Sequence, residues 1–80
     1  MKQLAIMKDV GFGCRDIGRP ILWFNTYISN SECALQIISY QDAEEIIKKY
    51  HVNDVHDLEG KPCWVDAGNG MIKFLEPAII

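Results

Sequence analysis

The sequence predicts an α+β fold, a small antiparallel sheet of about five strands with one main helix packed on it, in the order β-β-β-α-β-β. Three observations support this prediction. Apolar and β-branched stretches with a period near two residues lie toward both ends of the chain, which is typical of strands. One central stretch has helical spacing instead. The pair Asn69-Gly70 separates two short apolar stretches and indicates a hairpin.

The first three strands are expected over residues 2–10, 21–29 and 32–38. Residues 2–10 alternate with a period near two, and Pro20 holds the chain extended before the second strand. Residues 21–29 are rich in aromatic and β-branched side chains, which favour strands. Asn30 and Ser31 supply turn residues. We therefore expect the second and third strands to form a hairpin.

A helix is expected from about Tyr40 to Tyr50. Ser39 followed three residues later by Asp42 resembles a capping box, and Tyr40, Ala43, Ile46, Ile47 and Tyr50 then recur at helical spacing. The charged residues between them, Glu44, Glu45, Lys48 and Lys49, are expected to face water. The helix therefore packs one face on the sheet.

The rest of the chain is predicted to hold a short turn and two strands. Asn53 is suited to cap a turn through Leu58, and Gly60 to end it in a left-handed conformation. Short apolar strands are expected over residues 63–66 and 71–75, on either side of the Asn69-Gly70 turn.

Size and composition predict a single domain over residues 1–80. The apolar fraction is 49%, enough for a packed core. The formal charge of −3 gives no reason to expect direct nucleic-acid binding over the whole surface. Charge interrupts the first residues, no apolar stretch reaches membrane-spanning length, and three cysteines without close pairs indicate reduced thiols rather than disulfides. A cytoplasmic protein without membrane contact is expected.

The stretch GFGCRDIGRP, residues 11–20, is the most unusual loop in the sequence. Its glycine spacing matches neither a dinucleotide-binding fingerprint nor a P-loop, so the glycines are interpreted as shaping the connection between the first two strands. Arg15 and Arg19 flank Asp16 and present forked guanidinium groups suited to carboxylates or phosphates. Ion pairs within the molecule, with Asp16, Glu32 or Asp66, are an equally open use of the two arginines.

The residues that catalyse reactions or bind metals elsewhere form no convincing set here. Cys14 would need His51 or His56 to fold against it to become a nucleophile. The histidines and cysteines lack the tight spacing of a zinc site. We therefore expect no catalytic residue, no metal and no cofactor, and a protein that is not an enzyme.

The aromatic residues of the predicted strands suggest a binding surface. Alternation places Trp23 and Tyr27 on one face of the second strand. If they share an uncovered face with Gln36 and Trp64, the four side chains suit a protein partner, because Trp, Tyr and Arg dominate binding hot spots. Stacking on a nucleotide base is a rival use, and completing a small core is the simpler interpretation for Trp64.

Four segments, CRDIGRPILWF, ALQ, DAEEII and LEGKPCWV, together resemble short accessory proteins encoded by tailed bacteriophages and prophages. The resemblance extends from about Gly11 to Phe74, and its most distinctive part is the segment around Arg15 and Trp23. It carries over no active site. It implies a role against host defence, as in anti-CRISPR proteins or proteins that sequester nucleotide immune signals.

The resulting hypothesis is a phage-encoded, non-enzymatic inhibitor that binds a host defence protein or complex stoichiometrically in the host cytoplasm. The expected contact residues are Arg15, Asp16, Arg19, Trp23, Tyr27, Gln36 and Trp64. A sponge for a nucleotide ligand and a structural or accessory protein of the phage are the alternatives. Exposed strand edges and the apolar tail Pro77-Ala78-Ile79-Ile80 also suggest a homodimer.

Overall fold

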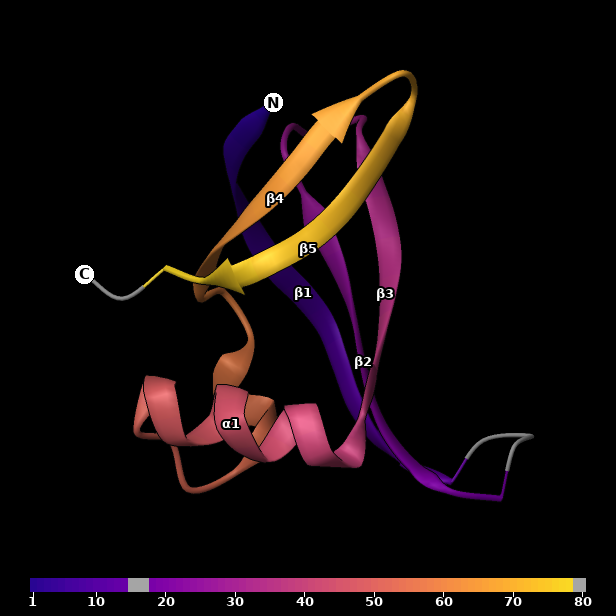
Figure 1. The fold of residues 1–80 in the computed structure, drawn as a ribbon. Helices are drawn as coiled ribbons and strands as arrows, with labels where there is room; N and C mark the ends of the chain where they lie inside the picture. Colours follow the sequence, from indigo (N-terminus) through magenta and orange to yellow (C-terminus); the bar gives the residue numbers. More distant parts are fainter. Residues whose placement is uncertain (15–17, 79–80) are drawn as a thin grey trace.

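The computed structural model describes residues 1–14 and 18–78, and within them it confirms the α+β fold (Figure 1). Five antiparallel strands form one sheet, with a helix between the third and fourth strands. The elements in chain order are β1 (Lys2–Cys14), β2 (Pro20–Tyr27), β3 (Cys33–Ser39), α1 (Tyr40–Tyr50), the short 3₁₀ helix η1 (Val55–Leu58), β4 (Pro62–Gly68) and β5 (Met71–Pro77).

β1 is longer than the sequence predicted. It was expected to end at residue 10, but it continues to Cys14, so the first part of GFGCRDIGRP belongs to a strand rather than to a loop. The extension pairs with β2 from Gly11↔Trp23 to Cys14↔Pro20. Glycine is tolerated in this strand because aromatic and apolar residues of β2 lie opposite it. The ends of β1 and β2 project beyond the rest of the sheet (Figure 1), and we call residues 12–14 and 18–20 the arm.

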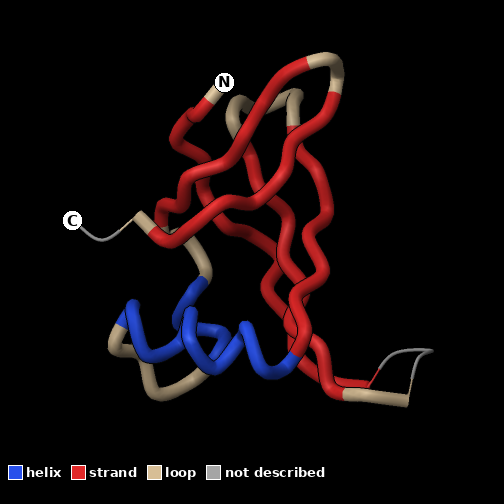
Figure 2. The backbone as a smooth tube through the Cα atoms, in the orientation of Figure 1, coloured by secondary structure: helices blue, strands red, loops and turns tan. Residues whose placement is uncertain are grey.

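The strands lie in the order β3-β2-β1-β4-β5. Three strands joined by hairpins, followed by a fourth that returns beside the first, make a Greek key. The sheet curls, so that its two outermost strands, β3 and β5, come close to each other, while α1 lies across one end (Figure 2). The fold is therefore a curled Greek-key sheet with a helix at one end.

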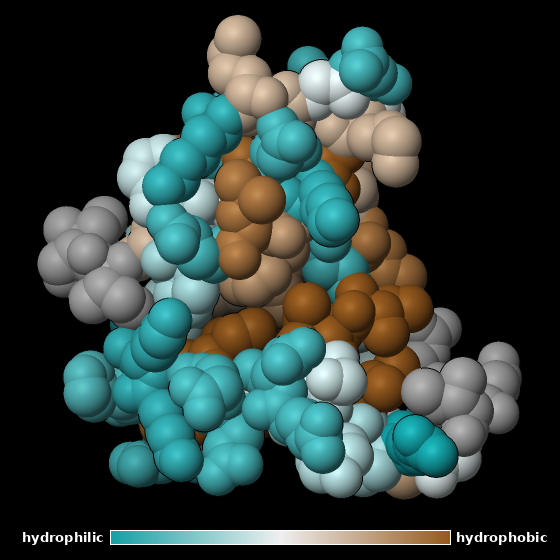
Figure 3. Space-filling view, viewed as in Figure 1, coloured by the Kyte–Doolittle hydropathy of each residue, from teal (hydrophilic) through white to brown (hydrophobic). Residues whose placement is uncertain are grey.

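Helix α1 begins and ends where the sequence predicted. The Ser39 side chain accepts a hydrogen bond from the Asp42 amide at 3.4 Å, and His51 ends the helix in a left-handed conformation. Ala43 and Ile46 are buried against the sheet, while the opposite face of the helix is hydrophilic (Figure 3). One pair on that face, Glu44 and Lys48, is joined at 3.2 Å.

The turn predicted before Gly60 and the turn predicted at Asn69-Gly70 both form, but the first is capped by a different residue. Asp54, not Asn53, caps η1 by accepting from the His56 amide, because its carboxylate reaches two residues along the chain. Gly60 is left-handed as expected. Asn69 and Gly70 both have positive φ, as a two-residue hairpin turn of this type requires.

The core lies inside the curl of the sheet and against α1. Phe24, Met7, Leu22, Leu58 and Val65 have the largest fully buried apolar side chains, and the rings of Phe24 and Phe74 meet edge to face with centroids 5.5 Å apart. No helix of the described residues is long and apolar enough to cross a bilayer.

Candidate functional site

The strands present a second row of side chains on the side of the sheet opposite the core, and we call this surface the outer face. Residues directly opposite on neighbouring strands share a face, so the register identifies its members. They are Leu4, Ile6, Lys8, Trp23, Asn25, Tyr27, Leu35, Ile37 and Trp64. Trp23, Tyr27 and Trp64 therefore lie on one face, as the hypothesis required.

Trp23 packs against the backbone of β1. It pairs with Gly11 across the two strands, and a methyl group at position 11 would lie 2.3 Å from Cε2 of the indole. The ring therefore covers Gly11, which is buried for that reason. The contact ties Trp23 to the base of the arm.

The ammonium group of Lys8 lies over the ring of Tyr27. The Lys8 ammonium lies 5.1 Å from the ring centroid, a cation–π distance. A hydrogen bond with Cys33, the residue opposite on β3, raises the pKa of the Tyr27 hydroxyl. Tyr27 at neutral pH is thus a neutral aromatic group beside a cation.

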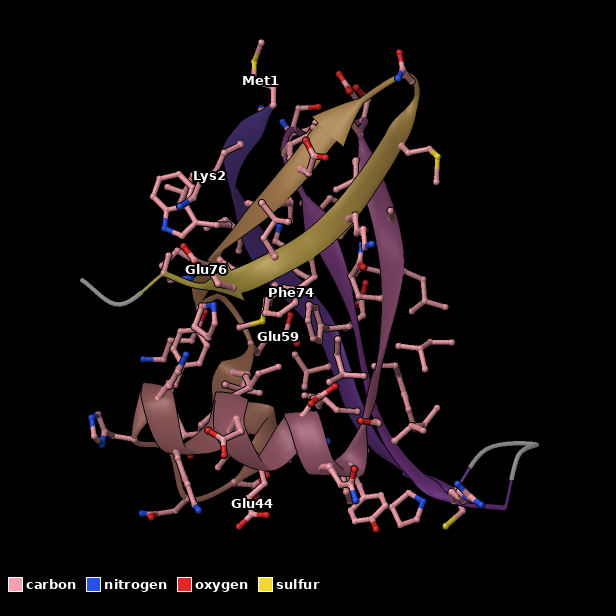
Figure 4. The ribbon with its side chains drawn as sticks, viewed as in Figure 1. Met1, Lys2, Glu44, Glu59, Phe74 and Glu76 are labelled. Atoms are coloured by element: carbon pink, nitrogen blue, oxygen red, sulfur yellow. The ribbon has the colours of Figure 1, made fainter. Side chains whose placement is uncertain are left out.

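Trp64 has the same arrangement at the other end of β1. The Lys2 ammonium lies 5.0 Å from the Trp64 ring centroid and 2.8 Å from Glu76 Oε1. Lys2 and Glu76 face each other across the sheet in Figure 4, and this hydrogen bond lowers the pKa of Glu76. Next to them the amino terminus of Met1 is paired with Asp66.

The outer face of β3 is apolar and exposed. Leu35 and Ile37 are 50% and 57% exposed, and they lie beside Asn25 and Trp23 respectively. An apolar area is visible over β3 in Figure 3. Exposed neighbouring aliphatic side chains next to an indole form a surface that favours association with a partner.

Gln36 does not belong to this face, and the expectation that it would share a surface with Trp23, Tyr27 and Trp64 is corrected here. It lies opposite Phe24 on the inner side of the sheet. Its amide nitrogen donates to the Ile72 carbonyl at 2.8 Å and to Thr26 Oγ1 at 3.3 Å, and its oxygen accepts from the Phe74 amide at 3.2 Å. The side chain of Gln36 therefore joins β3 to β5 and closes the curled sheet.

Arg19, in the stretch GFGCRDIGRP, lies on the arm. Arg19 is exposed and, within the described residues, has no ion-pair partner. Arg15 and Asp16 lie outside the described residues. Asp66, one of the carboxylates considered as a partner for the arginines, is bound by the amino terminus instead.

The cysteines differ in burial, and one histidine is paired with a carboxylate. Cys63 is buried, and burial raises the pKa of its thiol to about 11, which disfavours the nucleophilic thiolate. Cys14 and Cys33 are exposed. His56 lies 3.0 Å from Asp54. Among residues 1–14 and 18–78, no group of three or more His, Cys, Asp or Glu side chains is placed to hold a metal ion.

The surface of the described residues includes two hollows of about 400 Å³ each. One lies at the open end of the sheet, between Cys33 and the Gly68–Ile72 segment. The other is apolar and lies between the arm and α1, where Phe12 and Pro20 face Tyr40 and Ile47. Neither is lined by Arg19, Trp23 or Trp64.

Two features were missed in the sequence. The Glu59 carboxylate accepts hydrogen bonds from the backbone of β1, fifty residues earlier in the chain, and nothing local to Glu59 signals such a contact. Leu35 and Ile37 could have been found, because alternation placed them opposite the core-facing residues of their strand.

Comparison with known proteins finds no family model, no curated protein and no solved structure that matches this chain.

Proposed function

We propose that this protein is a small non-enzymatic binding protein that acts by stoichiometric contact with a protein partner. The observation that carries the proposal is the exposure of Leu35 and Ile37 on the outer face, where Ile37 lies opposite Trp23. Neighbouring exposed apolar side chains on one face are a common feature of surfaces that bind another protein. The proposed contact surface consists of the outer face, the arm with Arg19, and Arg15.

The distribution of charge on the outer face supports a protein partner. Lys8 and Lys2 lie over Tyr27 and Trp64, while the part around Trp23, Leu35 and Ile37 carries no charged side chain on β2 or β3. An uncharged aromatic centre with a polar border is the usual composition of a protein–protein interface. Arg19 on the arm is an exposed cation.

The resemblance to phage accessory proteins supplies the kind of partner. We propose a bacterial host defence protein or complex, which the protein would inhibit by occupying its surface in the host cytoplasm, as anti-CRISPR proteins do. Inhibition by surface contact requires shape and charge complementarity rather than catalysis. Such inhibition needs no nucleophilic side chain, and the buried thiol of Cys63 is a poor nucleophile.

A capture experiment with matched variants tests the proposal. The tagged protein is used to capture partners from lysates of bacteria that carry defence systems, and Leu35→Lys with Ile37→Lys is compared with Arg15→Ala with Arg19→Ala. Both pairs should reduce capture of a specific partner at least tenfold. Met71→Lys, which changes an equally apolar residue that is 72% exposed at the open end of the sheet, should not.

Unchanged capture by both double variants would reject the outer face and the arm as the contact surface. Inhibition of the purified partner by the wild-type protein at equimolar ratio is the second requirement. An effect at much lower ratios would indicate turnover and contradict a non-enzymatic role.

A nucleotide sponge is the second candidate, and the architecture favours it. Five-stranded, partly open Greek-key barrels include the OB-fold, which binds oligonucleotides on the face of its second and third strands, and aromatic rings stack on bases. Against it, lysines of the chain already cover Tyr27 and Trp64. Calorimetry with cyclic and linear nucleotides decides: binding in the micromolar range or tighter, lost in Arg15→Ala with Arg19→Ala, would favour the sponge.

A further inference from the structure

Strand β1 has an irregularity at the base of the arm. The register passes from Lys8↔Asn25 to Gly11↔Trp23, so that Asp9 and Val10 together face a single residue of β2. This is a β-bulge, which bends a strand and leaves backbone groups outside the ladder. Asp9 has a φ of 57°, the left-handed conformation that glycine occupies in many bulges and that Asp tolerates.

The Glu59 carboxylate bonds the two amides at the bulge. Its Oε2 accepts from the Asp9 amide and its Oε1 from the Val10 amide, each at 3.1 Å. Hydrogen bonds to an ionised acceptor are stronger than those between neutral groups. A single side chain therefore serves both residues of the bulge.

Glu59 reaches this position because its segment continues the edge of the sheet. β4 pairs with β1 only as far as Ile6↔Pro62. Beyond that point the Met7 amide donates to the Lys61 carbonyl at 2.9 Å, and the Gly60 amide to the Met7 carbonyl at 2.7 Å. Glu59 follows next along β1, and Figure 4 shows it beside that strand. Its side chain takes the place of a strand where β4 ends.

The bulge lies between the body of the sheet and the arm. Immediately after the bulge, the Trp23 ring packs over Gly11. The paired ends of β1 and β2 continue from there toward Cys14 and Arg19. On the β2 side, Asn25 Nδ2 donates to Asp9 Oδ2 at 2.9 Å. The bend at Asp9 and Val10 therefore sets how Gly11 lies against the Trp23 ring and in which direction the arm leaves the sheet.

We propose that Glu59 is a positioning residue for the binding surface: by holding the bulge, it sets the direction in which Trp23 and the arm are presented to a partner. The consequence for affinity rests on the proposed function, whereas the positioning itself can be measured on the free protein. Without the carboxylate, the arm pivots at Asp9 and Val10. Affinity then falls although Glu59 is not part of the contact surface.

The test uses Glu59→Ala and Glu59→Gln in a Trp64→Phe background, in which Trp23 is the only tryptophan. Glu59→Ala removes both acceptors, and we expect the Asp9 and Val10 amides to exchange with solvent at least tenfold faster. The fluorescence emission of Trp23 should shift to longer wavelength, and its indole ring should become more accessible to a quencher. Glu59→Gln keeps one oxygen acceptor, so one of the two amides should remain protected and the shift should be smaller.

Two control variants separate positioning from general loss of stability. Glu45→Gln changes an exposed glutamate on α1 and should alter none of these signals. Ile72→Ala loosens the packing of β5 against the core, and β5 does not pair with β1, so it should lower stability while leaving Trp23 emission in the folded protein as in the parent.

Unchanged amide exchange at Asp9 and Val10 in both Glu59 variants would overturn the proposal, as would equal Trp23 shifts in Ile72→Ala and Glu59→Ala. With a captured partner, Glu59→Ala should bind at least fivefold more weakly than Ile72→Ala, and equal affinities would also overturn it. Absence of any partner would reject the proposed function alone, because exchange and emission still judge the positioning.

Discussion

The indole of Trp23 lies so close over Gly11 that there is no room for a side chain on that residue. The two residues pair across β1 and β2 directly after the bulge at Asp9 and Val10. A glycine inside a strand is usually unfavourable, but here the aromatic ring replaces the missing side chain and shields the backbone. Gly11 thus fixes the place of an aromatic residue on the outer face.

Gly11→Ala should destabilise the protein by about 1 to 3 kcal/mol, because the methyl group and the ring cannot both keep their positions and overpacking costs that order of free energy. Urea unfolding measures the change, and Trp23 emission should shift with it. Gly13→Ala is the matched control on the same strand. Its methyl group would lie 3.9 Å from Trp23, an ordinary contact, so a loss as large as that of Gly11→Ala would contradict this account of the pair.

Gln36→Ala should cost about 1 to 3 kcal/mol, because it leaves the half-buried Phe74 amide and the Ile72 carbonyl without this partner. The Phe74 amide should also exchange faster with solvent than in the wild type. Gln41→Ala, at an exposed position of α1, should change stability by less than about 0.5 kcal/mol. Equal effects of the two substitutions would show that Gln36 does not close the sheet.

Stability should decline at alkaline pH in two overlapping steps. Burial raises the pKa of Cys63 from 9.0 to about 11 and that of Tyr50 from 10.0 to about 12. In each case the folded state favours the neutral form, so the stabilisation is complete below the ordinary pKa and is lost as the pH rises through the folded-state value. The free energy of unfolding should therefore fall between about pH 9 and pH 12.

Tyr50→Phe should remove the later part of that decline and keep the part that belongs to Cys63. It should also lower stability near neutral pH by about 1 kcal/mol, because the hydroxyl donates to the Pro62 carbonyl and accepts from the Ala78 amide at 3.2 Å. Urea unfolding from pH 8 to pH 11.5 measures both effects. A decline identical to that of the wild type would contradict the assignment to Tyr50.

Thiol labelling should distinguish the three cysteines. Cys14 and Cys33 are exposed and Cys63 is buried with a raised pKa. At pH 8 an alkylating reagent should therefore modify two thiols quickly and Cys63 only as fast as the protein opens. Mass spectrometry of the digested protein identifies the sites. Rapid modification of Cys63 in the native protein would contradict its place in the core.

The order of elements and the helix could be predicted because they depend on local patterns. The signals for these elements are local in the sequence: the Ser39 cap, the apolar spacing of α1 and the Asn69-Gly70 turn each depend on residues only a few positions apart. Alternation was sufficient to place Trp23 and Tyr27 on one face of β2. These parts of the fold were available from the sequence alone.

The closing of the sheet was not predictable in the same way. Gln36 bonds to β5 because the sheet curls, and Glu59 bonds to β1 because β4 ends early. Both contacts join residues that are 36 or more positions apart, and neither side chain has a local signature. The extension of β1 through a glycine-rich segment was missed for a related reason, since Trp23 compensates for Gly11 from another strand.

The most direct test of the account is to map a partner's contact on the protein by amide NMR. A partner obtained by capture is added to labelled protein, and the shifts of all resolved amides are compared. The account predicts the largest changes at Lys8, Trp23, Tyr27, Leu35 and Ile37 and on the arm. Changes confined to the outer surface of α1, or to the hollow between Cys33 and Met71, would contradict it.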